Sequence, residues 1–292
     1  MAASESGLPA GVVARPLRAS DLEAALALSG EAGWNQVAAD WRIFLELGNA
    51  ICLTRGDGPP FATAATLPHS GSLAWISMVL VTAAERRQGF ARWLLRHCRD
   101  DLLARKLVPA LDATPAGRAV YLGLGFADRW SSSRLVGGMV QVPVANAAAA
   151  TVRPLAAHDW PQLAAYDAAA FGADRTALLR RLAERLPQAA LIADRDGQIV
   201  GFSLGRDGRV MTQIGPLAAD DETIARAVLT RASATLGAPL AIDVPDRHTE
   251  LRSWLATLGF TAERPLTRMV YGTSLTFGDS GRLFAIAGPE LG

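Results

Sequence analysis

A stretch in the first third of the chain has the residue types and spacing of a phosphate-binding site. Residues 76–81 form a short apolar, β-branched run, which is typical of a buried strand, and from Phe90 the apolar side chains recur at helical spacing. The polar link between them contains Gly89, which lets a ligand approach the backbone. The first N–H groups of such a helix are unpaired and its positive dipole end faces the loop, so a phosphate or pyrophosphate is the expected guest.

The same order of elements is also compatible with a plain strand–loop–helix connection, because one glycine is a weak signal. A nucleotide-binding P-loop is disfavoured, since the Lys-Ser/Thr pair that follows the glycine of that motif is missing here. Further residues are therefore needed to choose between the two interpretations.

The sequence Arg86-x-x-Gly89-x-Ala91, after a strand that ends in Val81, resembles the acetyl-CoA-binding motif of the GNAT N-acetyltransferases, Arg/Gln-x-x-Gly-x-Gly/Ala. The resemblance implies that N–H groups of the loop bind the pyrophosphate of acetyl-CoA. It also implies that the strand edge pairs with the pantetheine arm, as a neighbouring strand would. The implied cofactor-binding residues are Val79, Leu80, Val81, Arg86, Arg87, Gln88, Gly89, Phe90, Ala91 and Arg92.

A second motif, Tyr121-x-x-x-Gly125-Phe126, follows the strand expected at 108–113 and resembles the end of a GNAT domain. By this resemblance Tyr121 is the candidate proton donor to the departing thiolate, although its ring could instead pack the short helix onto the sheet. The general base stays open, because a water chain could replace a side chain in that role. The carboxylates and histidine of the first half that could approach the cleft are Glu31, Asp40, Glu85, His69 and Asp112.

The string Gly33-Trp34-Asn35 interrupts the helices expected at 22–29 and 37–47, and it is also similar to the family. The resemblance implies that Trp34 and Asn35 line the acceptor side of the cleft, while the alternative for Trp34 is a buried lid residue. The acceptor itself stays open among a polyamine, an amino acid, an antibiotic and a peptide N-terminus.

The amino-acid composition disfavours a protein that binds nucleic acid or a membrane surface. Among 292 residues, 29 basic and 28 acidic side chains give a net charge of +1, which offers no electrostatic case for nucleic acid or a membrane as a partner. The expected partner is a small-molecule or peptide amine, and the chain is expected to be a monomer or homodimer. Cys52 and Cys98 give neither a disulfide framework nor metal-ligand spacing, so we expect reduced cysteines, no metal and a cytoplasmic location. Residues 1–10 do not have the pattern of a signal peptide.

The second half of the chain repeats the first. Arg153-Pro154-Leu155 echoes Arg15-Pro16-Leu17, and Gly259-Phe260 echoes Gly125-Phe126, so the two offsets, 138 and 134 residues, are nearly equal. Such echoes predict an internal duplication. We expect a GNAT acetyltransferase domain at 1–145, a linker at 146–150 and a GNAT-like domain at 151–292.

The predicted fold is α/β (α+β), with two tandem GNAT-like domains, each a mixed, mostly antiparallel sheet flanked by helices. In the second copy a strand is expected at 209–214, and the phosphate loop that should follow it is degenerate. Asp220, Asp221 and Glu222 would repel a pyrophosphate, and Pro216 lacks an N–H donor. The tail at 282–288 could add one more strand.

These features favour a transferase, an acetyl-CoA-dependent N-acetyltransferase, whose first half is catalytic and whose second half closes the acceptor cleft. The rival hypothesis is a non-catalytic module that binds acetyl-CoA or CoA as a sensor or interaction protein. Turnover of acetyl-CoA with a panel of amines would separate the two.

Overall fold

In a computed structural model, which describes residues 7–138, 150–237, 239–272 and 277–292, the helices and strands follow the same order in two halves. The first half contains β1 (Val12–Pro16), α1 (Leu22–Glu31), α2 (Ala38–Leu47), β2 (Asn49–Arg55), β3 (Ala62–Pro68), β4 (Leu73–Val81), α3 (Phe90–Ala104), β5 (Val108–Ala113), α4 (Pro115–Leu122) and β6 (Phe126–Gly137). The second half contains β7 (Thr151–Pro154), α5 (Trp160–Phe171), α6 (Thr176–Arg185), β8 (Leu191–Arg195), β9 (Gln198–Arg206), β10 (Thr212–Ala219), α7 (Glu222–Ser233), β11 (Leu240–Pro245), α8 (Thr249–Thr257), β12 (Thr261–Tyr271) and β13 (Leu283–Ala285). This order confirms the predicted duplication; residues 146–149 of the predicted linker lie outside the described residues.

An equivalent ion pair in each half explains why the Arg-Pro-Leu motif occurs near the start of both halves. Arg15 binds both carboxylate oxygens of Asp21, at 2.7 and 2.9 Å, and Arg153 binds Asp159 in the same way, at 2.8 Å for both contacts. Each aspartate also accepts a backbone N–H three residues before it, so it fixes the turn that starts the first helix. The repeated arginine and aspartate therefore connect the first strand of each half to its first helix.

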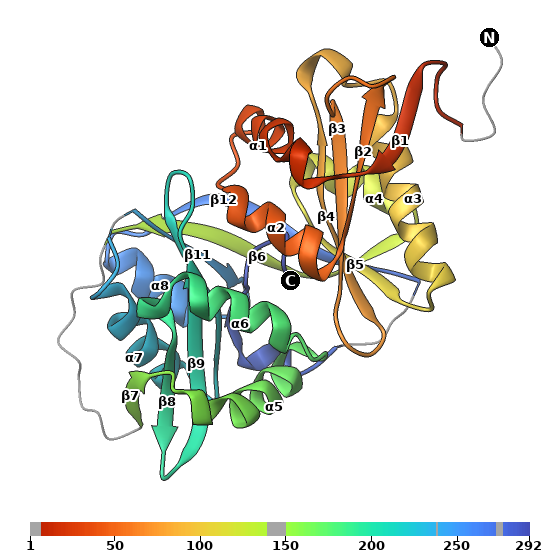
Figure 1. The fold of residues 1–292 in the computed structure, drawn as a ribbon. Helices are drawn as coiled ribbons and strands as arrows, with labels where there is room; N and C mark the ends of the chain where they lie inside the picture. The colour runs from red at the N-terminus through yellow and green to blue at the C-terminus, as the bar shows by residue number, and fades with distance from the viewer. Residues whose placement is uncertain (1–6, 139–149, 238, 273–276) are drawn as a thin grey trace.

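The strands of both halves form one sheet (Figure 1). Its order is β1-β2-β3-β4-β5-β12-β6-β11-β10-β9-β8-β7, and only β4–β5 and β10–β11 are parallel among the described strand pairs. The halves exchange their last strands: β12 of the second half pairs with β5, and β6 of the first half pairs with β11. The predicted pair of mostly antiparallel α/β sheets is thus confirmed, and the exchange joins the two sheets into one.

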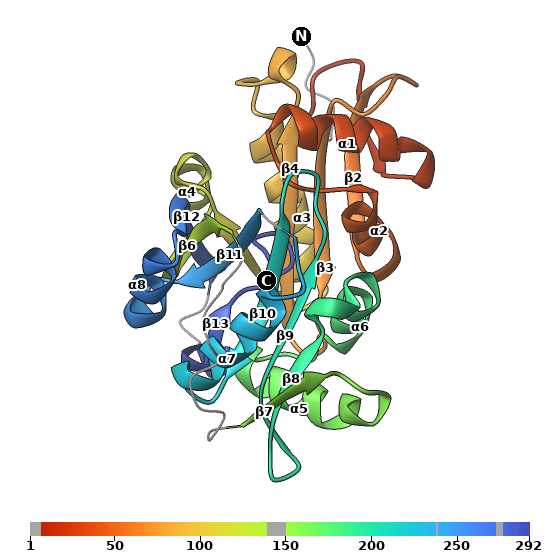
Figure 2. The ribbon, with the colours of Figure 1, turned by 90° about the vertical axis from the view of Figure 1, so that its left-hand side faces the viewer.

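Helices cover both faces of this sheet. Figure 2 shows α1, α2, α5 and α6 on one side, where side chains from both halves share a core that includes Trp41, Phe44, Leu163 and Leu182. On the opposite face α3 and α7 each pack over a separate core.

Cys52 and Cys98 are buried free thiols. No helix in the described part of the chain is both long and apolar enough to cross a membrane.

The strand expected at 209–214 is found at Thr212–Ala219, so it begins later and ends later than predicted, which corrects our interpretation of the second copy. β10 continues through Gly215 and Pro216 to Ala219, and α7 begins at Glu222. Asp221 caps α7 by accepting the Ile224 N–H at 2.9 Å. Two residues therefore connect β10 to α7, whereas the first half has an eight-residue loop at 82–89 between β4 and α3.

Candidate active site

The two parallel strands of the first half separate along their length and leave a gap in the sheet. Residues 73–75 of β4 pair with 108–110 of β5, and beyond them the other edge of β5 pairs with β12. A β-bulge lies in β4 beside the gap, where Met78 has a φ of 53° and the register with β3 shifts. Thr63 Oγ1 donates a hydrogen bond to the Met78 carbonyl at 2.9 Å, which holds this bulge. Such bulges re-aim backbone groups next to active sites.

The loop that joins β4 to α3 presents its backbone at the end of this gap. Gly89 forms the N-cap of α3 with a φ of 87°, and Arg87 has a φ of 64°, so both are left-handed. A side chain at Gly89 would meet no protein atom within 4 Å, so open space lies in front of its backbone. Alternation of left-handed and ordinary residues turns successive N–H groups toward one point, which makes an anion-binding concavity.

Hydrogen bonds fix the shape of this loop. Glu31, at the end of α1, accepts from Thr82 Oγ1 at 2.8 Å and from the Ala83 N–H. Arg86 reaches back to the Val81 carbonyl at 3.0 Å and to Glu31 at 3.3 Å. The bonds from Thr82 and Ala83 hold the pKa of Glu31 below its usual value. Glu31 and Arg86 therefore shape the loop, and this explains Glu31 without a role as a base.

Two adjoining cavities run from the loop into the gap. The outer cavity, about 340 Å³, is lined by Val81, by the loop and by α4, and the inner one, about 300 Å³, lies between β4 and β5. Ala91 and Val120 line both. Of the predicted cofactor residues, those that line a cavity are Val79, Val81, Arg86, Arg87, Gly89, Phe90, Ala91 and Arg92. Two do not: the Leu80 side chain is buried in the core, and Gln88 donates to Glu85 at 2.9 Å.

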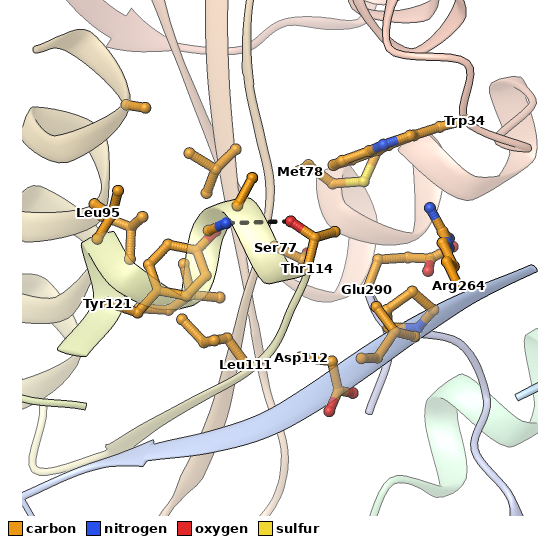
Figure 3. A pocket seen from close by; sticks show the side chains of 18 of the residues that line it. Trp34, Ser77, Met78, Leu95, Leu111, Asp112, Thr114, Tyr121, Arg264 and Glu290 are labelled. Atoms are coloured by element: carbon orange, nitrogen blue, oxygen red, sulfur yellow. Dashed lines mark hydrogen bonds between the residues drawn. The ribbon is translucent and has the colours of Figure 1, made fainter. Parts of the chain in front are cut away.

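Tyr121 lies on the same side of the inner cavity as Leu95 of α3 (Figure 3). Thr114 caps its helix by accepting the Gly117 N–H at 3.3 Å. The ring lies over Gly117, where an added Cβ would come within 3.0 Å of the Tyr121 hydroxyl, so glycine is needed there. Burial raises the pKa of Tyr121 to about 12, so the phenol keeps its proton at neutral pH.

The opposite wall of the inner cavity is polar and comes from several distant segments. Figure 3 shows Trp34, Arg264 and Glu290 on this side, facing Tyr121 and Leu95 across the cavity. Gln36 lies there as well. Arg264 belongs to β12, and Glu290 belongs to the tail after β13. The second half thus supplies part of the wall.

The remaining base candidates have structural partners. Asp40 is buried between Arg185 and Arg206 of the second half, which outweigh burial and hold its pKa below the usual range. Asp112 binds Arg268 through both oxygens, at 3.0 and 2.9 Å.

His69 and Glu85 are also explained by their surroundings. Burial, together with Arg175 and Arg268, lowers the pKa of His69 to about 3, and its ring packs edge-on against Phe171. Glu85 forms two hydrogen bonds of 2.8 Å with Arg55 at the surface. Neither residue lines the inner cavity.

Asn35, predicted to contact the acceptor, makes its hydrogen bonds elsewhere. Its Oδ1 accepts the N–H groups of Val210 and Met211, and its Nδ2 donates to the Met211 carbonyl at 2.8 Å. Both ends of the amide hold the β9–β10 connection, so the structure gives Asn35 a docking role between the halves. Its neighbours Trp34 and Gln36 line the cavity.

Three residues of the polar wall were not identified from the sequence. Gln36 follows the Trp34-Asn35 string directly, so it lay beside a recognised pattern, whereas Arg264 lay outside the motifs named from the sequence. Glu290 carried no signal, because a tail of small and apolar residues gives no indication that it enters the other half of the molecule.

The corresponding gap of the second half is filled by the chain itself. Beyond 212–214, where β10 pairs with β11, β13 pairs with the edge of β10, and Ile286 donates its N–H to the Asp243 carbonyl of β11 at 3.1 Å. The predicted extra strand of the tail is thus found, shortened to Leu283–Ala285. It occupies the position at which the first half has its inner cavity.

Comparison with known proteins bears on this architecture. Residues 163–285 match the model of an acetyltransferase (GNAT) domain. The chain is 27% identical over 271 residues to YitH of Bacillus subtilis (strain 168), an uncharacterized N-acetyltransferase, covering 91% of this chain and 94% of that protein.

Solved structures share the fold over nearly the full length. A Pyrococcus horikoshii protein, 21% identical, superposes with a TM-score of 0.80 over 98% of this chain and 97% of its own. A tandem GNAT protein from the clavulanic acid biosynthesis pathway, 13% identical, gives 0.63 over 90% and 100%. The chain therefore contains a region that matches a GNAT acetyltransferase domain, is similar over its length to an N-acetyltransferase, and has the fold of a tandem GNAT protein.

Proposed function

We propose that this protein transfers an acetyl group from acetyl-CoA to the amine of an acceptor. One observation carries the proposal: the gap between β4 and β5 adjoins an anion-binding loop at one end and a pocket with a buried carboxylate, Glu290, at the other. A thioester in the gap would have its phosphorylated part on the loop and an amine beside the carboxylate.

The loop fits the pyrophosphate of the cofactor. The left-handed Arg87 and Gly89 and the open space over Gly89 leave backbone donors of residues 87–92 accessible at the N-terminus of α3. Arg87 and Arg92 line the same cavity and add positive charge. The edge of β4 at residues 79–81, which no described strand pairs on the side of the gap, would hydrogen-bond to the pantetheine arm.

The transfer requires a bond from the acceptor nitrogen to the acetyl carbon and cleavage of the carbon–sulfur bond. A protonated acceptor releases two protons in all, one before and one after attack; the thiolate takes up one, and the other passes to solvent. The bulge at Met78–Val79 would supply the N–H that polarises the thioester carbonyl. Tyr121, kept protonated by its raised pKa, would give the proton to the thiolate.

The first test combines binding with turnover. Calorimetry with acetyl-CoA reports the cofactor site, and release of free CoA in the presence of an amine panel reports transfer. Cys52 and Cys98 are buried, so a thiol reagent would read mainly the released CoA. Binding without turnover of any amine would favour the sensor hypothesis, and absence of binding would contradict both.

A further inference from the structure

The polar wall of the inner cavity carries groups whose hydrogen-bonding capacity is unused. They come from three segments: Gln36 from the α1–α2 connection, Arg264 from β12 and Glu290 from the tail. Gln36 Oε1, Arg264 Nε and Glu290 Oε2 are each enclosed and have no hydrogen-bond partner among the described residues. Buried polar atoms are nearly always paired, so three residues that line one cavity and each hold an unpaired buried atom indicate a missing ligand.

The buried charges around this wall are otherwise balanced. Glu290 Oε1 accepts from Gln36 at 2.8 Å and pairs with Arg206, which also binds Asp40. The other buried carboxylates of the seam between the halves each face an arginine as well: Asp112 with Arg268, and Asp243 with Arg134 at 2.7 and 2.8 Å. Every buried acid of this network therefore has its counter-ion.

Arg264 is the exception. Its guanidinium forms no ion pair within 4.0 Å and no hydrogen bond with the residues that the structure describes. The pKa of Arg264 is lowered by burial and by Arg134. These two effects outweigh the nearby carboxylates, which act to raise it: Asp243, Glu290 and Glu263. A largely buried guanidinium without a partner is costly, and its planar donors match a carboxylate. The charged group of the pocket that lacks a counter-ion is thus the Arg264 guanidinium, which is suited to bind a carboxylate.

The free acceptor atoms belong to two residues of the same wall. Glu290 is 3% exposed and Gln36 is 6% exposed, and each keeps one oxygen without a donor. Two oxygens, one of them charged, suit the N–H groups of an ammonium. The wall therefore offers one anion-binding group and two cation-binding oxygens.

We infer that the acceptor is an amino acid, an inference that rests on the proposed transferase function. Arg264 binds its carboxylate, while Glu290 and Gln36 hold its amine beside the gap between β4 and β5. A polyamine would instead place an ammonium against an unpaired guanidinium, which like-charge repulsion disfavours.

The test uses matched acceptors that differ only in the carboxylate. L-phenylalanine, L-leucine and L-lysine are compared with phenethylamine, 3-methylbutylamine and cadaverine. We expect kcat/KM to be about 10- to 100-fold higher for the amino acid in the pair that the enzyme uses best, the scale of a charge-assisted contact. In Arg264→Gln this ratio should fall to near one with the KM for acetyl-CoA unchanged. The exposed Arg231 of α7 gives the control Arg231→Gln, which should keep the wild-type ratio.

A second readout needs no acetyl-CoA. The twenty standard L-amino acids are screened by thermal shift, and at least one should stabilise the wild type and Arg231→Gln but not Arg264→Gln. Removal of an unpaired buried charge should not unfold the variant. Preference for the decarboxylated amines, an unchanged ratio in Arg264→Gln, or no shift with any amino acid would overturn the inference. Failure of acetyl-CoA to bind in calorimetry would instead overturn the proposed function, and the thermal shift would still decide this inference.

Discussion

Tyr121 is set apart at the residue scale by its environment. Its ring lies over Gly117, its side chain lines the inner cavity, and burial raises its pKa to about 12. An ordinary tyrosine would begin to lose its proton near pH 10. The raised pKa means that Tyr121 stays a proton donor throughout the pH range of an enzyme assay.

Replacing Tyr121 by Phe should therefore slow turnover by roughly 10²- to 10⁴-fold, the scale of a lost general acid. Acetyl-CoA affinity and the unfolding temperature should change little, because the ring remains. Steady-state kinetics and calorimetry measure the two effects. Full turnover would show that Tyr121 only packs α4, and kcat of the wild type should not fall between pH 8 and pH 10 through loss of this proton.

Gly89 permits a test of the loop that separates strain from binding. Valine there should abolish acetyl-CoA binding, because its side chain would fill the open space in front of the loop backbone. The left-handed φ of 87° adds about 1–2 kcal/mol of strain. Gly56, with a φ of 53° in the β2–β3 turn, gives a matched control, since Gly56→Val carries similar strain away from the cavities. Calorimetry that finds equal affinity in both variants would exclude the loop as the pyrophosphate site.

At the scale of elements, sequence periodicity correctly predicted those helices and strands that are determined by residues close together in the sequence. β4, the loop and α3 were anticipated because apolar spacing and one glycine define a strand, a turn and a helix locally. β10 was predicted too short, because Gly215 and Pro216 are typical of a turn, whereas the neighbouring strands β9 and β13 keep this segment in the sheet.

The acceptor wall could be predicted only in part. Trp34 stood in a recognised helix break and lines the cavity, and its contact with the acceptor stays a prediction. Glu290 reaches the site because Trp75 Nε1 donates to the Pro289 carbonyl at 3.0 Å and draws the tail against β4. A contact between residues more than two hundred positions apart leaves no periodic pattern in the sequence, so Glu290 and Arg264 required the structure.

β13 leads to a prediction about stoichiometry. It fills the gap between β10 and β11, and only Asp220 and Asp221 connect β10 to α7, so the described residues leave no open gap for pantetheine between these strands and no loop for pyrophosphate before α7. Calorimetry should therefore give one acetyl-CoA per chain. A value of two would contradict this reading of the second half. Gly89→Val supplies the control, because in that variant no heat from a second site should remain.

At the scale of the molecule, His69 makes the seam between the halves sensitive to acid. It packs against Phe171 of α5, and Arg175 and Arg268 add to burial in lowering its pKa to about 3. Asp174 and the Leu291 backbone act in the opposite direction. The unfolded state, with a pKa near 6.5, binds a proton that the folded state excludes, so stability falls as the pH drops below about 6.5.

The free energy of unfolding should therefore fall by roughly 1–2 kcal/mol between pH 6.5 and pH 5 through His69 alone. His69→Gln removes the titrating group and should flatten this part of the profile. Urea unfolding of both proteins across this range measures the difference. Identical slopes would mean that His69 accepts a proton in the folded state as easily as in the unfolded one.

The exchange of last strands predicts that neither half folds alone. The two exchanged strands β6 and β12 pair along ten positions in the centre of the sheet, and buried ion pairs cross the seam at Arg134–Asp243 and Arg268–Asp112. A fragment of residues 1–145 would keep β6 without β11 or β12, leave the edge of β5 unpaired and bury Asp112 without its arginine. An unpaired buried charge and an open sheet edge both disfavour the isolated fold.

Fragments 1–145 and 151–292 should each aggregate or stay unfolded when made separately. When co-expressed, they should form a one-to-one complex that binds one acetyl-CoA. Size-exclusion chromatography with light scattering and circular dichroism would check this, with the intact chain as the control. A monomeric fragment 1–145 that unfolds cooperatively would show that the first half is complete without β12 and that the exchanged strand only docks onto it.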